Sequence, residues 1–179
     1  MIATRVLAAV LLLPGAAAAQ TIQPPMSTAA ADEPMAAPAD YRQVWADEFD
    51  GERLDTAKWR YDTARNKAGW WNNELQYYAA NRPENVRVEN GRLVIEARKE
   101  RLADRADYGG QDYSSGKIFT RGLADWKYGF FEIRAKLACG KGLWPAIWML
   151  GSDESTDWPG LGEIDIMEHV GWDPGRHAP

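Results

Sequence analysis

One short stretch of the chain gathers the side chains with the clearest chemical potential. Residues 163–168 read Glu-Ile-Asp-Ile-Met-Glu, so carboxyl groups alternate with apolar side chains. This period of two is typical of a β-strand, in which Glu163 and Asp165 share one face. In a regular strand Glu168 points to the other face. One extra residue, a β-bulge near 166–167, returns Glu168 to the face of Glu163 and Asp165.

The bulged strand is predicted to have two faces of different character. Ile164 and Ile166 are expected to face the core, with Met167 joining them on the apolar side. Three carboxyl groups then crowd the other face, where like charges raise one another's pKa. Such crowding costs stability, so it indicates a functional reason.

Glycoside hydrolysis supplies such a reason. A retaining enzyme needs two carboxyl groups about 5–5.5 Å apart, one an ionised nucleophile and one a protonated acid that later acts as base. The backbones of Glu163 and Glu168 lie roughly 13 Å apart along a bulged strand at ~3.3 Å per residue, a gap that long side chains can narrow. Two alternatives stay open at this point. One is a solvated acidic edge that discourages aggregation; the other is a Ca²⁺ or Mg²⁺ site, against which the intervening isoleucines argue.

The elements that must position this strand also follow a period of two. Val86–Val88 and Leu93–Ala97 flank Asn90-Gly91, which predicts a β-hairpin because both turn residues tolerate positive φ. Phe131–Leu137 alternates cleanly and is expected to have one buried and one polar face. Other strands are predicted over 43–48, 59–61, 75–79, 116–120, 146–150 and 162–169. Amphipathic helices are absent from the pattern, so the sequence predicts an all-β sandwich or barrel.

Composition narrows the class of partner. The net charge is -5 with no basic stripe, which argues against nucleic acid. No stretch after the N-terminal residues is apolar enough to span a membrane. The chain has nine Trp, all from Trp45 onward, which favours stacking surfaces such as those that bind the C–H face of a sugar. The single Cys139 excludes an intramolecular disulfide and is expected to be a small, semi-buried residue.

The N-terminal region divides from the rest by composition. Residues 1–19 have one positive charge, a short apolar run and small residues before Gln20, which predicts a signal peptide and a secreted protein, extracellular or periplasmic. Residues 20–40 are rich in Ala and Pro and are interpreted as a disordered linker. Residues 41–179 are left as the folded domain.

Several blocks carry a family resemblance. Residues 162–171, Gly-Glu-Ile-Asp-Ile-Met-Glu-His-Val-Gly, closely resemble the signature of glycoside hydrolase family 16, in particular of laminarinase-like endo-β-1,3-glucanases. The support is spread along the chain in family order, over residues 45–51, 71–78, 128–136 and 142–150. The resemblance implies a β-jelly-roll of two curved antiparallel sheets with a substrate cleft on the concave face.

The resemblance also implies roles for individual residues. By position, Glu163 is the nucleophile, Glu168 the acid/base and Asp165 the assisting carboxylate between them. Residues implied to bind substrate are Trp144 and Trp148 by stacking on glucose units, Asn73 and Glu74 through sugar hydroxyls, and Arg134, for which an ion pair with Glu132 is the structural alternative.

The implied substrate is a β-1,3 or mixed β-1,3/1,4-glucan, cut internally by a protein that we expect to be a monomer and to need no cofactor. A structural calcium is implied by Glu48 and the backbone carbonyl of Gly91, which match two ligands of some family members. The alternatives are a non-catalytic carbohydrate-binding protein on the same fold, or an inactive fragment. Family members continue well beyond the catalytic strand, so we expect the domain to be incomplete and the 179-residue chain by itself to be poorly folded or inactive.

Overall fold

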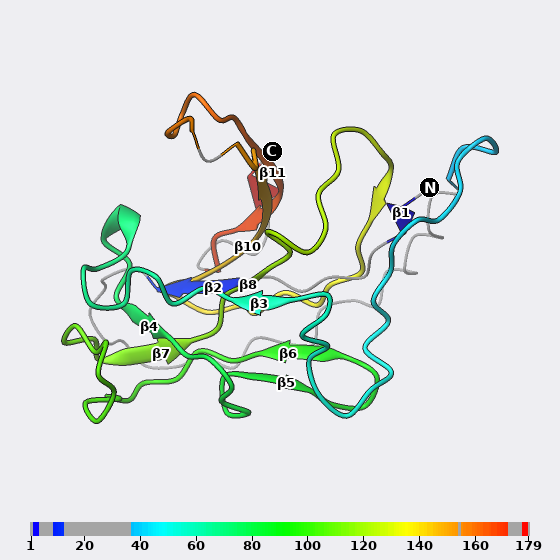
Figure 1. Ribbon diagram of the computed structural model, residues 1–179. Coiled ribbons are helices and arrows are strands. Elements are labelled where there is room, and N and C mark those ends of the chain that lie inside the picture. The colour runs from blue at the N-terminus through cyan, green and yellow to red at the C-terminus, as the bar shows by residue number, and fades with distance from the viewer. Residues whose placement is uncertain (1, 4–8, 13–36, 154, 172–176, 179) are drawn as a thin grey trace.

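The computed structural model describes residues 2–3, 9–12, 37–153, 155–171 and 177–178, and in these ranges the regular structure is almost entirely β (Figure 1). The one helical element among them is a 3₁₀ turn, η1, at Trp71–Asn73. The strands, in chain order, are β1 (Ile2–Ala3), β2 (Ala9–Leu12), β3 (Arg60–Tyr61), β4 (Gln76–Tyr78), β5 (Val86–Val88), β6 (Leu93–Ile95), β7 (Tyr113–Ser115), β8 (Ile118–Phe119), β9 (Phe131–Glu132), β10 (Leu143–Leu150), β11 (Glu163–His169) and β12 (His177–Ala178). The predicted all-β class is confirmed.

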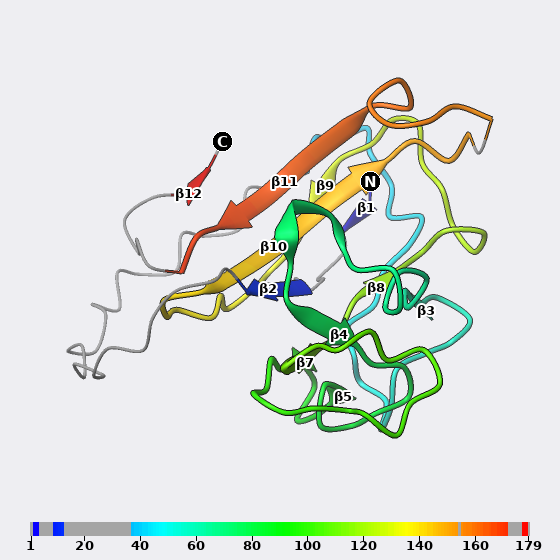
Figure 2. The same ribbon diagram turned by 90° about the vertical axis from the view of Figure 1, so that its left-hand side faces the viewer.

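The long antiparallel pair β10–β11 dominates the arrangement, as Figure 2 shows. These strands form the centre of a four-stranded sheet in the order β12-β11-β10-β2. The remaining strands pair two by two, as β1–β9, β3–β8, β4–β7 and β5–β6. Two of these pairs, β1–β9 and β4–β7, are parallel, a local difference from the all-antiparallel sheets that we expected.

The predicted hairpin forms as β5 and β6, with Val86 opposite Ile95 and Val88 opposite Leu93. Its turn residues have positive φ, 53° at Asn90 and 68° at Gly91. Positive φ at both central positions matches the twist of the flanking strands, which is why the Asn-Gly pair identifies such turns.

The main hydrophobic core lies beside this hairpin. Its buried members are Phe49, Leu54, Trp59, Val86, Leu93 and Ile95. Residues 43–48 are held against this core by Asp47. Its buried carboxylate accepts hydrogen bonds from the Trp59 indole (2.8 Å) and the Phe49 backbone N–H (3.0 Å). The predicted strand over 43–48 is therefore wrong: side-chain contacts, rather than a backbone ladder, hold this segment.

The other predicted strands largely form, within shorter or longer limits. Those over 59–61, 75–79, 116–120, 146–150 and 162–169 correspond to β3, β4, β8, β10 and β11. Tyr113–Ser115, which forms β7, was not predicted. The strand over 131–137 is wrong beyond Glu132, because β9 pairs with β1 only at Phe131 and Glu132. An alternating sequence determines which side chains share a face of a strand, but it does not determine whether a neighbouring strand is present to form the backbone hydrogen bonds.

The apolar face of β11 also differs from the prediction. Ile164 is 63% exposed and Ile166 is 40% exposed, so they do not face a core within the described part of the chain. Cys139 was expected to be semi-buried but is exposed. The predicted signal peptide and linker fall outside the described residues, except for β1, β2 and residues 37–40. A search of the described residues found no helix suited to crossing a membrane.

Candidate active site

The β10–β11 ladder contains the predicted bulge. Leu150 lies opposite Glu163 and Trp148 opposite Asp165, whereas Ala146 lies opposite Glu168. The register shifts between Ile147 and Trp148, so that Ile166 is the extra residue on β11. Because directly opposed residues share a face and every second residue of β10 faces the same way, Glu163, Asp165 and Glu168 all project from one face.

The electrostatics of Glu168 reflect this grouping. Burial raises the pKa of the Glu168 carboxyl, and the negative charges of Asp165 and Glu163 raise it further. The indole N–H of Trp144 lowers the pKa, although the contact does not reach hydrogen-bond geometry. A raised pKa keeps a larger share of Glu168 protonated near neutral pH, which suits a general acid.

Glu163 lies in a more open environment, at the end of β11 next to the loop from β10. The indole N–H of Trp158 in this loop donates a hydrogen bond of 2.6 Å to Oε2 of Glu163. One carboxylate oxygen is thereby held, and the two glutamates experience different surroundings. Such a difference is what separates the roles of nucleophile and acid.

The two predicted cleft tryptophans belong to an aromatic cluster beside the carboxyl groups. Trp144 packs against buried Trp70 and Tyr78. The Lys117 ammonium lies 4.8 Å from the Trp70 ring centroid and 5.0 Å from that of Trp148. It also forms a 2.9 Å ion pair with Asp62. Trp148 and Trp144 are thus anchored on the side of the sheet that carries the carboxyl groups.

Asn73 and Glu74 enter the same region from η1. Asn73 is exposed and has a positive φ of 57°. Glu74 is half-buried and accepts hydrogen bonds from Gln76 (2.8 Å) and the Tyr78 hydroxyl (3.4 Å). Burial raises the pKa of Glu74, whereas the bond from Gln76 and the Lys117 charge lower it. The predicted hydroxyl-binding pair therefore adjoins the cluster that holds Trp144.

Arg134 is not brought to this site by any contact that the structure shows. Arg134 is exposed and follows β9 in the chain. Among the described residues it forms no hydrogen bond or ion pair, and the alternative ion pair with Glu132 is not formed either.

The residues implied to hold calcium lie elsewhere. Glu48 is exposed, and Gly91 is in the β5–β6 turn. Among the described residues, no group of three or more His, Cys, Asp or Glu side chains has the geometry of a metal site. The geometry therefore does not test the calcium prediction.

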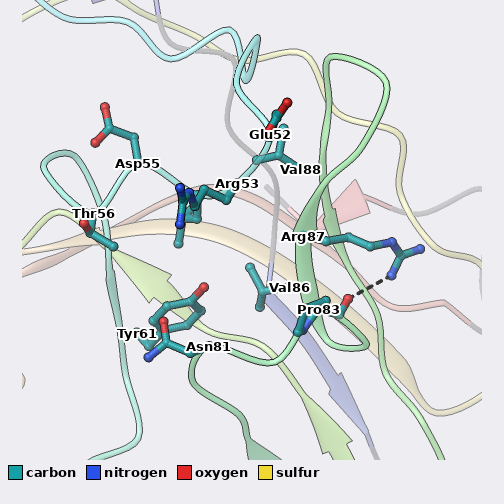
Figure 3. A pocket seen from close by; sticks show the side chains of 11 residues that line it. Glu52, Arg53, Asp55, Thr56, Tyr61, Asn81, Pro83, Val86, Arg87 and Val88 are labelled. Atoms are coloured by element: carbon teal, nitrogen blue, oxygen red, sulfur yellow. Dashed lines mark hydrogen bonds between the residues drawn. The ribbon is translucent and has the colours of Figure 1, made fainter.

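A hollow of about 610 Å³ lies against β5, and Figure 3 shows the side chains that line it. Its lining includes Arg53, Asp55, Tyr61, Asn81 and Arg87. Arg87 forms ion pairs with Glu89 and Glu96. None of the carboxyl groups of β11, and neither Trp144 nor Trp148, is among the residues that line this hollow. The acidic face of β11 is chemically the better candidate for a reaction.

Comparison with known proteins decides the family. The profile of glycosyl hydrolases family 16 matches residues 73–178. The chain belongs to that family. It is 53% identical over 135 residues to a β-glucanase of Rhodothermus marinus, a match that covers 73% of this chain and 44% of the relative. It is 44% identical over 140 residues to glucan endo-1,3-β-glucosidase A1 of Niallia circulans, covering 74% of this chain and 20% of the relative.

Solved family 16 structures have the same fold. A variant of SCLam, a non-specific endo-β-1,3(4)-glucanase, is 74% identical with a TM-score of 0.77, covering 79% of this chain and 55% of that one. The laminarinase of Rhodothermus marinus is 52% identical with a TM-score of 0.65, covering 73% and 51%. The predicted jelly-roll is confirmed by these likenesses. The chain spans about half the length of the relatives that it matches, or less.

Two contacts in this family 16 site were missed from sequence. Lys117 was not singled out, because no local pattern connects it with tryptophans 31 and 47 residues away. Trp158 carried only the general hint given by the number of tryptophans in the chain. Both contacts arise between segments that only the fold brings together.

Proposed function

We propose that this chain carries the catalytic strand of a retaining endo-glycosidase that cleaves β-1,3 or mixed β-1,3/1,4 linkages of glucans. The observation that carries the proposal is the bulged register, which projects Glu163, Asp165 and Glu168 from one face of β11. The raised pKa of Glu168 and the neighbouring Trp144 and Trp148 support the same reading. The relatives named above act on β-glucans, according to their names.

In the proposed reaction, Glu163 attacks the anomeric carbon while Glu168 gives its proton to the leaving glycosidic oxygen. The bond to the leaving sugar breaks, and a glycosyl ester of Glu163 forms. Glu168, now ionised, takes a proton from a water molecule that attacks the same carbon, which releases the sugar and restores both carboxyl groups. Asp165 between them keeps the pKa of Glu168 raised through its charge.

Two variants, Glu163→Gln and Glu168→Gln, test these roles. Each is made in a fusion, the completed protein, in which this chain is followed by the matching C-terminal segment of the 74%-identical glucanase. The 179-residue chain is assayed beside it. Reducing-sugar release from laminarin and lichenan is expected to fall by about 10²–10⁴-fold or more in either variant. Activity within a few-fold of the parent would contradict the assignment.

A binding function without catalysis is the alternative. One relative, 44% identical over 61 residues, is a β-1,3-glucan-binding protein of Penaeus monodon. Both glutamates are present and project from one face of β11, which argues against this reading. Laminarin binding by the completed protein without release of reducing ends would favour it.

We further propose that the protein is exported with removal of residues 1–19, which takes β1 and β2 away from their partners β9 and β10. The short apolar run and small residues before Gln20 support this. Sequencing of the mature protein is expected to find Gln20 as its first residue. An N-terminus that still contains the apolar run would contradict the proposal.

A further inference from the structure

Trp71 is the least buried tryptophan of the aromatic cluster beside the carboxyl face. Its side chain is 61% exposed, whereas that of Trp70 is 7% exposed. Trp70 packs into the cluster with Tyr78 and Trp144, while Trp71 stands outward on η1. Single exposed aromatic residues are common on protein surfaces, so the case for Trp71 depends on the contacts that orient its ring and on its polar neighbours.

The ring is held in a fixed orientation. The Arg65 guanidinium carbon lies 4.1 Å from the Trp71 ring centroid. Arg65 is itself fixed, since its Nε donates to the Gly69 carbonyl (3.1 Å) and its own carbonyl accepts from the Gly69 amide (2.8 Å). The Trp70 ring adds an edge contact at 6.3 Å. A pre-oriented ring loses little conformational entropy when a ligand stacks on it.

Polar groups stand beside the ring. Asn72 and Asn73 both have φ of 57°, a left-handed conformation that costs energy in residues other than glycine. Both are exposed, so their amides can donate to and accept from hydroxyl groups next to the ring. An apolar ring with polar groups at its edge matches the two surfaces of a pyranose, its C–H face and its hydroxyl rim.

The position of η1 connects the ring with the carboxyl face. Trp70 next to it contacts the cluster that includes Trp144, and Lys117 spans Trp70 and Trp148. Trp148 in turn lies opposite Asp165 on β11. In Figure 2 the turn that leads into β4, which contains η1, faces the viewer. Trp71 therefore adds one further ring, through Trp70, to the aromatic cluster that contains Trp144.

We propose that Trp71 is a binding platform for a glucosyl unit of a β-glucan chain, outside the units that contact Trp144 and Trp148. The inference rests on the proposed function. A short oligosaccharide that occupies only the units next to the carboxyl groups does not reach the platform, whereas a longer chain does. The platform therefore adds affinity for long substrates and leaves the chemical step unchanged.

The test compares Trp71→Ala with its parent, in the completed protein, on laminarin oligosaccharides of increasing length. For long chains KM is expected to rise roughly 3- to 10-fold with kcat unchanged, the scale of one aromatic stacking contact. For the shortest substrate that is cleaved, both constants stay the same. Trp71→Phe, which keeps an apolar ring, is expected to restore much of the affinity.

Tyr128→Ala is the matched control, because Tyr128 is also an exposed aromatic residue, 83% exposed, with a cation, Lys127, 5.6 Å from its ring. It is expected to leave KM unchanged for every length. A KM rise of equal size for short and long substrates in Trp71→Ala, or an equal rise in Tyr128→Ala, would overturn the inference.

A second readout separates this inference from the proposed catalysis. Retardation of the protein in a native gel that contains laminarin is expected to weaken in Trp71→Ala and not in Tyr128→Ala. If the parent protein bound laminarin without hydrolysing it, this pattern would support the platform while the catalytic proposal failed. Equal retardation of parent and Trp71→Ala would overturn the platform alone.

Discussion

Deletion of Ile166 and deletion of Ile164 are expected to have opposite effects on the arrangement of the carboxyl groups of β11. Ile166 is the extra residue of the bulge, so its deletion leaves a regular ladder in which Asp165 stays opposite Trp148 and Glu168 stays opposite Ala146. The three carboxyl groups then keep one face. Deletion of Ile164 moves Glu163 to the position opposite Met149, on the other face of the sheet.

Deletion of Ile166, which keeps the carboxyl groups on one face, is nevertheless expected to cost more stability than deletion of Ile164. Full burial of an isoleucine side chain contributes about 1.5–3 kcal/mol. Ile166 is 40% exposed, so its removal costs about 1–2 kcal/mol of burial; Ile164 is 63% exposed, and its removal costs about 0.5–1 kcal/mol. Burial therefore predicts that deletion of Ile164 is the milder change for folding.

Activity is expected to depend on whether the three carboxyl groups share one face of β11, and not on which deletion costs more stability. Without Ile164, glucan hydrolysis falls at least as far as when one positioned catalytic group is lost, about 10²–10⁴-fold. Without Ile166, the loss is expected to stay within about tenfold, because the same groups remain on one face. Initial rates on laminarin, with melting temperatures of both deletions, measure the two effects in one completed protein. Equal loss of activity in two folded deletions would refute the reasoning from register.

Three substitutions test individual contacts. Asp165→Asn removes a charge that raises the pKa of Glu168, so the alkaline limb of the kcat/KM profile is expected to move to lower pH; an unmoved limb would contradict the assignment of that limb to Glu168. Trp158→Phe keeps the ring but removes the hydrogen bond to Glu163, and kcat/KM is expected to fall about 2- to 10-fold, as a contribution of about 0.5–1.5 kcal/mol predicts. Lys117→Met leaves its aspartate partner without an ion pair and is expected to destabilise the fold by about 1–3 kcal/mol, measured by urea denaturation; an unchanged midpoint would show that the cation contributes nothing to the aromatic cluster.

Local pattern was sufficient where neighbouring residues alone determine the outcome. The Asn90-Gly91 turn fixes the β5–β6 hairpin because its backbone angles are encoded by two adjacent residues. The bulge near Ile166 was predictable for a related reason, since only one insertion places three carboxyl groups and the apolar residues on separate faces.

The local sequence pattern gave wrong predictions where a strand requires a neighbouring strand to pair with, or where an apolar face requires another segment to bury it. Residues 133–137 alternate as a strand does, yet no strand pairs with them in the described part of the chain. Ile164 and Ile166 read as core residues, and the structure leaves them exposed. His169, 30 residues from Cys139, lies 3.9 Å from its sulfur, a contact that no spacing rule indicates.

The sequence by itself determined the all-β class and the acidic strand with its bulge, and the roles of the carboxyl groups remain predictions from the family resemblance. Only the tertiary structure decided which groups surround them. It placed the Trp158 indole on Glu163, the Lys117 ammonium between Trp70 and Trp148, and the Arg65 guanidinium on Trp71. The physical reason is that the faces of a strand follow from the order of adjacent residues, whereas contacts between side chains depend on how separate segments pack in space.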